Sequence, residues 1–166
     1  MDEAGLTQDP YLCKQWCRKG QQKVVAAPAG VHWTLHVFGA LNVMDDTLCW
    51  TLAETRSSDS MIAWLEQLMT KHYPTQNVCV VLDNASYHRS GLVQAAASLF
   101  AERLQLFFLP PHCPELNPIE PYWKHFKRHT CGNFLCTSRA HLQERAVSAL
   151  NHQNDLTASG RYLICH

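Results

Sequence analysis

The sequence predicts an α/β protein built on a mixed sheet with flanking helices. Apolar residues alternate with polar ones over residues 32–43 and 47–55, which predicts an antiparallel hairpin that turns at Asp45 and Asp46. Val78–Leu82 is an unbroken apolar run, which is typical of a strand buried on both faces in a parallel sheet. Apolar residues at helical spacing separate the later strands, and this pattern predicts crossover helices.

The remaining elements follow from local signals. A helix over 59–73 is expected after N-cap candidates at 57–60, and Pro74 ends it. A helix over 90–103 leads to a strand over 104–109, which Pro110 and Pro111 stop. Two more helices are expected over 119–130 and 138–151. Turn formers predict irregular structure over 4–31, with a short strand at 23–26.

Length and composition limit the possible classes of protein. The 166 residues, 46% hydrophobic and 17% charged, fit one soluble domain over 1–166. No segment has the length of a membrane span or the form of a leader, so we expect a cytoplasmic protein without a membrane partner. The formal net charge of zero is unusual for a domain that grips DNA alone, but it suits a catalytic domain that works beside a separate DNA-binding region.

The eight cysteines do not form a recognisable framework. The sequence contains no C-x-x-C pair, and reduced thiols in a cytosolic protein are the favoured interpretation. The nearest approach to a zinc cluster is the set His125, His129, Cys131 and Cys136. Its spacing matches no common zinc finger, so a structural zinc site stays an alternative only.

Three acidic residues are the candidate catalytic and metal-binding residues. Asp83 directly follows the strand at 78–82, and sites in open sheets form beyond the carboxyl ends of parallel strands. A proline-rich loop delivers Glu120 to the first turn of a helix, and Asp2 stands at the start of the chain. Each acid also has a structural interpretation: a turn for Asp83, helix capping with Asn117 for Glu120, and a solvated terminus for Asp2.

Other polar residues lie near these acids in the sequence. Glu3 and Glu115 are further candidate acids. His88, five residues after Asp83, could pack as a satisfied polar residue, touch a phosphate or orient a water molecule. Lys124 and Lys127 share the helix face of Glu120. We therefore predict a DNA-binding set beside the acids, made of His88, Arg89, Lys124, Lys127 and Arg128.

Two motifs carry a family resemblance. Asp83-Asn-Ala-x-x-His88 and the run from Leu109-Pro-Pro to Glu120-x-x-Trp123-x-x-x-Lys127 together resemble a DDE transposase, of the bacterial insertion-sequence branch of the mariner superfamily. The opening Met1-Asp2-Glu3-Ala-Gly and two later segments, at 16–20 and 37–42, resemble the same branch in the same order. The resemblance covers roughly residues 2–130. Pro121 and the pair at 112–113 depart from the family pattern.

This resemblance implies a ribonuclease H-like fold with its first strand largely truncated and the helix-turn-helix DNA-binding region absent. It further implies that Asp2, Asp83 and Glu120 hold two Mg²⁺ or Mn²⁺ ions, which cleave DNA at insertion-sequence ends and join it to target DNA without a covalent protein nucleophile. The family pattern implies a homodimer in the synaptic complex and a place at the bacterial nucleoid.

Three alternatives stay open at this level. One is a ribonuclease H-like nuclease that cuts DNA but does not join it. Another is a catalytically inactive, truncated transposase remnant, which acts at most as a nucleic-acid or protein interaction module. The last is the zinc-binding module described above.

Overall fold

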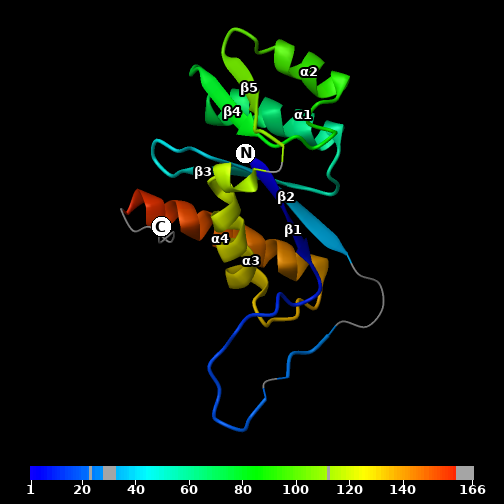
Figure 1. Cartoon of the computed structure of the whole chain (residues 1–166), viewed down its shortest axis with the longest axis vertical. Coiled ribbons are helices and arrows are strands. Elements are labelled where there is room, and N and C mark those ends of the chain that lie inside the picture. Colours follow the sequence, from blue (N-terminus) through cyan, green and yellow to red (C-terminus); the bar gives the residue numbers. More distant parts are fainter. Residues whose placement is uncertain (23, 28–32, 112, 160–166) are drawn as a thin grey trace. The chain divides into compact units, whose positions relative to one another are not determined.

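The computed structural model describes residues 1–22, 24–27, 33–111 and 113–159 (Figure 1). The chain divides into two compact units. The first unit contains Met1–Ala4 and His36–Glu120, and the second contains Gly5–Leu35 and Pro121–His166. All three candidate acids belong to the first unit.

The N-terminal strands form a three-stranded sheet in the order β1 (Asp2–Thr7), β2 (Thr34–Leu41) and β3 (Leu48–Ala53) (Figure 1). β2 and β3 pair antiparallel from His36 opposite Ala53 to Leu41 opposite Leu48, which confirms the predicted hairpin. At its turn Asp46 has a φ of 57°, a left-handed conformation that aspartate tolerates better than most residues.

The irregular structure expected over 4–31 is wrong for residues 4–7, which belong to β1. Ala4 and Leu6 are fully buried while Thr7 is exposed, so this segment has the two-residue period of a strand. Only these two apolar residues show the alternation, and a pattern of two is too short to predict a strand in an N-terminal segment rich in polar residues. Residues 24–26 form no strand, and residue 23 of that expected strand lies outside the described residues.

A second sheet in the first unit pairs β4 (Val78–Leu82) with β5 (Leu104–Phe108). The two strands are parallel, with Val78 beside Leu104 and Leu82 beside Phe108, as the expected crossover requires. Helix α1 (Ser58–Gln67), which continues as the π-helical turn η1 (Leu68–His72), precedes β4, and α2 (Gly91–Ser98) connects the two strands.

Serine side chains begin both helices of this unit. Ser57 accepts a hydrogen bond from the Ser60 backbone N–H at 3.2 Å, and Ser90 accepts one from Val93 at 3.3 Å. α2 is shorter than the predicted 90–103, because residues 99–103 turn through bonds to the third preceding carbonyl instead of continuing the helix.

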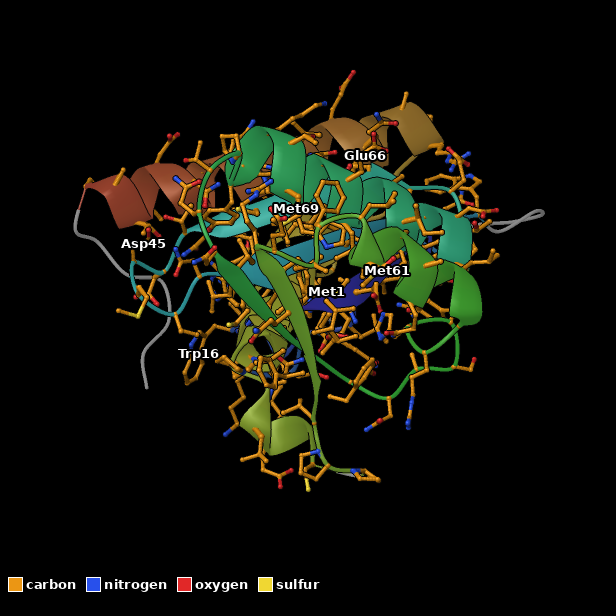
Figure 2. All side chains as sticks on the ribbon, turned by 90° about the horizontal axis from the view of Figure 1, so that it is seen from above. Met1, Trp16, Asp45, Met61, Glu66 and Met69 are labelled. Atoms are coloured by element: carbon orange, nitrogen blue, oxygen red, sulfur yellow. The ribbon has the colours of Figure 1, made fainter. Side chains whose placement is uncertain are left out.

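The core of the first unit lies between α1, α2 and one face of the β4–β5 pair. Met61, Trp64, Leu65 and Met69 pack there with buried strand residues, and Met1 joins the same cluster (Figure 2). The strand residues of the cluster alternate: they include Val80 and Leu82 but neither Cys79 nor Val81.

The prediction that β4 is buried on both faces is therefore wrong for the described residues. Val81 is 42% exposed and Cys79 is exposed, and Phe107 on β5 is 49% exposed. An unbroken apolar run does not reveal which face of a strand the helices cover.

The second unit contains α3 (Ile119–Cys131) from Pro121 onward and α4 (Arg139–Ala158). Tyr122, Trp123 and Phe126 are each 2% exposed, so the predicted core position of Trp123 is confirmed. α4 is longer than the predicted 138–151, because no proline or glycine interrupts residues 134–159.

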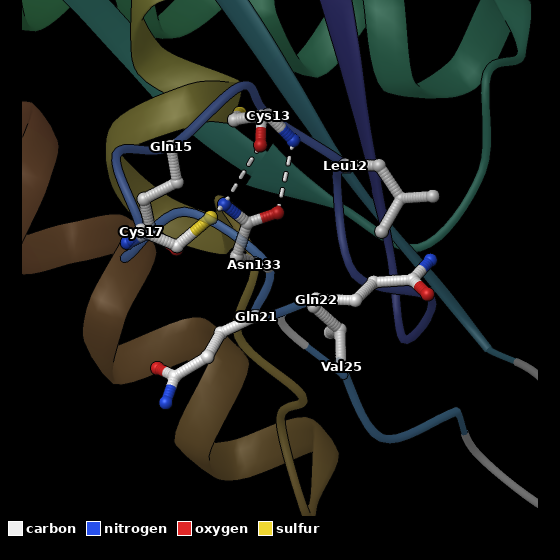
Figure 3. A pocket seen from close by; sticks show the side chains of 9 residues that line it. Leu12, Cys13, Gln15, Cys17, Gln21, Gln22, Val25 and Asn133 are labelled. Carbon is white, nitrogen blue, oxygen red and sulfur yellow. Dashed lines mark hydrogen bonds between the residues drawn. The ribbon is translucent and has the colours of Figure 1, made fainter.

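The loop after α3 binds the N-terminal segment of the same unit. Tyr11 and Cys131 are joined by a backbone hydrogen bond of 3.1 Å, and the Asn133 side chain bonds both the N–H and the carbonyl of Cys13, at 2.9 and 3.0 Å (Figure 3). Asn133 has a φ of 52°. Beside this contact lies a shallow cavity of about 510 Å³, lined by Cys17 and Val25 among others (Figure 3).

Candidate active site

The first residue of the chain holds Asp2 in position. The Met1 ammonium group donates a hydrogen bond to the Val81 carbonyl of β4 at 2.7 Å. The buried Asn117 amide donates to the Met1 carbonyl at 3.3 Å. These bonds tie the start of β1 both to β4, the strand that precedes Asp83, and to the loop that precedes Glu120. The first unit therefore gathers three segments that lie far apart in the sequence.

Asp83 directly follows β4, and its carboxylate already has two partners. Its Oδ1 accepts a hydrogen bond from the Ala85 N–H at 2.9 Å, so the residue does form the turn that its structural interpretation predicts. The same oxygen lies 2.8 Å from Nδ1 of His88. The side chain is nevertheless 51% exposed, which leaves the carboxylate accessible to a ligand.

A buried polar network stands behind Asp83. Nε2 of His88 lies 2.9 Å from Oε1 of Glu3, and the Tyr87 hydroxyl donates to the other Glu3 oxygen at 2.6 Å. The side chains of His88 and Glu3 are only 1% and 5% exposed. His88 thus lies between two carboxylates, with each ring nitrogen facing one of them, and neither nitrogen is free for the predicted DNA contact.

The charges of this network shift its pKa values. Burial alone lowers the pKa of His88, but the hydrogen bond and charge of Glu3, with the charge of Asp83, more than offset it and the pKa is raised. Burial and the bond to Glu3 raise the pKa of Tyr87, so the phenol stays protonated. Both carboxylate oxygens of Glu3 therefore have a hydrogen-bond partner, Tyr87 for one and His88 for the other.

Glu120 lies in the first turn of α3. Its backbone N–H bonds the Asn117 carbonyl at 3.2 Å, and its side chain is exposed. The proline that follows does not interrupt the helix, since N–H groups of the first turn have no intrahelical acceptor. Glu115, in the short 3₁₀ turn η2 (Pro114–Leu116), is exposed as well.

The charges of Asp83 and Glu120 both act on the Asp2 carboxyl group. The pKa of Asp2 is raised to about 6, chiefly by burial and also by the charges of Glu3, Glu120 and Asp83, against the lowering effect of the Glu3 N–H. Burial lowers the pKa of the Met1 ammonium group, and the charges of Asp2, Glu3 and Asp83 oppose this lowering. Perturbed carboxyl groups of this kind are concentrated in functional sites.

The donor set suits a hard divalent cation, although the side chains are not arranged as a metal cluster. Among the residues that the structure describes, no group of three or more His, Cys, Asp or Glu side chains is close enough to hold a metal ion. This statement covers the acids and also His125, His129, Cys131 and Cys136. Carboxylate oxygens are the ligands that Mg²⁺ and Mn²⁺ prefer. Burial is the main cause of the raised pKa of Asp2, and a cation would neutralise the neighbouring negative charges that add to it.

The remaining predicted DNA-binding residues lie in both units. In the first unit Arg89 is exposed, bonds Asn84 Oδ1 at 3.3 Å and lies over the Phe108 ring. On α3, Lys124 and Arg128 are exposed and Lys127 is half-buried. Sequence reasoning missed the roles of Tyr87, Asn117 and the Met1 ammonium group. The one available signal in the sequence was the position of Tyr87 next to His88, which could have suggested a role for Tyr87.

No helix in the described part of the chain is both long and apolar enough to cross a membrane.

Residues 1–142 match the family model described as DDE superfamily endonuclease. Among curated proteins, the chain is 24% identical over 139 residues to the insertion element IS630 uncharacterized 39 kDa protein of Shigella sonnei, covering 82% of this chain and 39% of that protein.

Solved structures show the same fold. The Mos1 transposase paired-end complex with left transposon end matches with a TM-score of 0.61 and 15% identity, over 98% of this chain and 55% of that one. The Mos1 mariner paired end complex with Mn matches with a TM-score of 0.60 and 17% identity, over the same shares of the two chains. The predicted ribonuclease H-like α/β fold is thereby confirmed. The chain spans about half the length of the matched structures and less of the curated relative.

Proposed function

Because the chain belongs to the DDE superfamily endonuclease family, we propose that it is a transposase catalytic domain that cleaves DNA at insertion-sequence ends and transfers the strand to target DNA. The observation that carries the proposal is that the charges of Asp83 and Glu120 both act on the Asp2 carboxyl group within one unit. These residues come from the start of β1, the end of β4 and the start of α3. The likeness to the IS630 protein and to the Mos1 complexes supports the same branch.

In this proposal Asp2, Asp83 and Glu120 hold two Mg²⁺ or Mn²⁺ ions. When bound, such ions supply the polarisation that activates a water or 3′ hydroxyl group and stabilises the leaving oxygen. The chain contributes oxygen ligands, and the mutual repulsion of its acids favours cation binding. One related structure is described with Mn, which supports a divalent ion here.

We assign His88 as a positioning residue rather than a DNA contact. The His88 ring lies 2.8 Å from Asp83 and 2.9 Å from the buried Glu3. Because Glu3 holds the ring in place, the ring in turn limits the rotation of the Asp83 carboxylate. Hydrogen-bonded neighbours of this kind orient carboxylates for ligand binding. Asp83 then presents its exposed portion to the ion.

DNA is the proposed substrate, and Arg89, Lys124, Lys127 and Arg128 are the proposed phosphate contacts. The zero net charge predicts weak binding by this chain alone, since phosphate neutralisation supplies most nonspecific affinity. One Mos1 structure is a paired-end complex with a transposon end, and its paired-end form supports a proposed homodimer that holds two ends. Such a protein would act at the bacterial nucleoid.

Nicking of supercoiled plasmid by the purified chain tests the proposal, with Mn²⁺ or Mg²⁺ present and with EDTA as the blank. We expect metal-dependent nicking that falls below detection in Asp83→Asn and Glu120→Gln. Glu115→Gln is the matched control, because Glu115 is an exposed acid of the same loop, and it should nick normally. A folded Asp83→Asn protein with full activity would refute the assignment.

One observation favours the alternative of an inactive remnant: the described acids are not arranged as a ready metal cluster. Titration calorimetry with Mn²⁺ separates the two functions. A remnant would give no heat that depends on the carboxylates, even when circular dichroism shows a folded chain. Strand-transfer products would in turn distinguish a transposase from a nuclease that only cuts.

A further inference from the structure

The net charge of zero is the sum of two opposite charges, one on each unit. The second unit, Gly5–Leu35 and Pro121–His166, contains ten lysine and arginine residues but only three aspartate and glutamate residues, so its net charge is +7 with histidine taken as neutral. The first unit contains four basic and eleven acidic residues, a net charge of −7. A polyanion is therefore attracted to the second unit.

A polar cavity of about 340 Å³ lies in this basic unit and is lined by the end of α3 and by α4. Three histidines line it, namely His129, His141 and His152. Arg145 also lines it, and Glu144 is the one acidic residue among its lining residues. The cavity therefore combines several hydrogen-bond donors with little negative charge.

Arg145 has a fixed orientation in the wall of this cavity. Its Nε donates a hydrogen bond to the Thr130 carbonyl at 2.9 Å, and its guanidinium carbon lies 4.3 Å from the centre of the Phe134 ring. These two contacts fix the plane of the guanidinium group but use only one of its N–H donors. Within the part of the chain that the structure describes, no carboxylate is paired with Arg145. Its terminal N–H groups are therefore available to an anion in the cavity.

The hydroxyl group of Thr130 also lacks a partner in this wall. Thr130 is 1% exposed, and its Oγ1 has no hydrogen-bond partner among the described residues. A buried hydroxyl group without a partner is unfavourable, which points to a ligand in the cavity that Thr130 lines. Ser148 on α4 contributes a second hydroxyl group. Donors on two helices suit a phosphate group, whose oxygens accept bonds in several directions, better than a planar carboxylate.

We propose that this cavity binds a phosphate group, with Arg145 as the charged donor and the hydroxyl groups of Thr130 and Ser148 as neutral donors. The positive charge of the unit favours a backbone phosphate of DNA over a free phosphate ion, and this choice of source rests on the proposed function. Lys124 and Arg128 are exposed on the same α3, so the site extends the proposed phosphate contacts of α3 onto α4.

Fluorescence anisotropy of a labelled DNA duplex, measured with the full chain in EDTA, tests the proposal without cleavage. Ser148→Glu places a carboxylate in the cavity, whereas the matched control Gln143→Glu adds the same charge at an exposed position of α4 outside it. We expect Ser148→Glu to weaken duplex binding about tenfold, and Gln143→Glu to weaken it by less than about twofold. Glu144→Gln removes the opposing carboxylate and should strengthen binding by up to about fivefold.

Thermal unfolding in inorganic phosphate, compared with chloride at the same ionic strength, identifies the source of the phosphate group. A Tm rise in phosphate that Ser148→Glu removes, together with duplex binding that the variant leaves intact, would assign the site to free phosphate and overturn the DNA source. Equal effects of Ser148→Glu and Gln143→Glu on duplex binding, with no Tm rise in phosphate, would overturn the site itself. Selective weakening by Ser148→Glu in a chain that never nicks DNA would refute the proposed chemistry and leave this site standing.

Discussion

Replacing Asp2 by asparagine should stabilise the protein while it abolishes the proposed activity. The pKa of Asp2 is raised from 3.8 to about 6, first by burial and then by like charges. At 1.36 kcal/mol per pH unit, this rise makes the ionised carboxylate cost the native state about 3 kcal/mol. Asparagine keeps the size and the acceptor oxygen without the charge.

The sign of the pH dependence follows from proton binding. Between pH 4 and pH 6 native Asp2 binds a proton more tightly than it does in the unfolded chain, so stability falls as the pH rises through this range. The full cost is present above pH 6. The gain of Asp2→Asn should therefore be complete at pH 7.5 and absent below pH 4.

Thermal unfolding followed by circular dichroism in EDTA measures this gain. A chain of this size changes its Tm by about 2–4 °C per kcal/mol, so we expect a rise of about 6–12 °C at pH 7.5. Asp45→Asn is the matched control, since Asp45 is exposed and asparagine can still accept the Thr47 N–H bond; its Tm should barely change. Millimolar Mn²⁺ should reduce the difference by stabilising the wild type alone. An unchanged or lower Tm for Asp2→Asn would refute the electrostatic account of the site.

Three further predictions concern packing and thiol chemistry. His88→Ala leaves Glu3 buried without its ring partner and should cost about 3–5 kcal/mol in chemical denaturation. Gly132→Ala should lower the Tm, because a β-carbon there would collide with a backbone carbonyl of α3. Burial raises the pKa of the Cys131 thiol to about 11, so iodoacetamide at pH 8 should alkylate exposed Cys17 and spare Cys131, as peptide mass spectrometry can measure.

Each of these three predictions has a control or an outcome that would contradict it. His152→Ala removes an exposed imidazole and should change stability by less than about 0.5 kcal/mol, so equal losses at His88 and His152 would contradict the buried network. Gly20→Ala is the comparison for Gly132→Ala. A β-carbon at position 20 would meet no neighbouring atom, but the residue has a φ of 85°, so the loss of stability would come from backbone conformation only. Fast alkylation of Cys131 in the folded chain would show that its burial is incomplete.

The sequence predicts local elements well where the period is long or the boundary residue is specific. The hairpin, α1 and β5 follow from alternation, serine caps and prolines, and each is confirmed. β1 was missed, because Ala4 and Leu6 are the only buried apolar residues that mark it. The one-sided burial of β4 was also missed, since the coverage of a strand depends on where distant helices pack.

The candidate site shows the same division. Asp83, Glu120 and Asp2 could be selected by their places beside predicted elements and by the family resemblance. The pairing of His88 with Glu3 joins residues 85 positions apart, and the contact of Asn117 with Met1 joins residues 116 apart. No local pattern encodes such contacts, because they arise only when the fold brings separate segments together.

The bond from the Met1 amine to the Val81 carbonyl makes the state of this nitrogen matter in any preparation of the 166-residue chain. A purification tag ahead of Met1 would exchange a positive, three-donor ammonium group for a neutral amide with one donor, a few bonds from Asp2. Tagged and untagged preparations would then differ in the charge balance around the acids. Biochemical work on this chain should therefore carry its tag at the C-terminus.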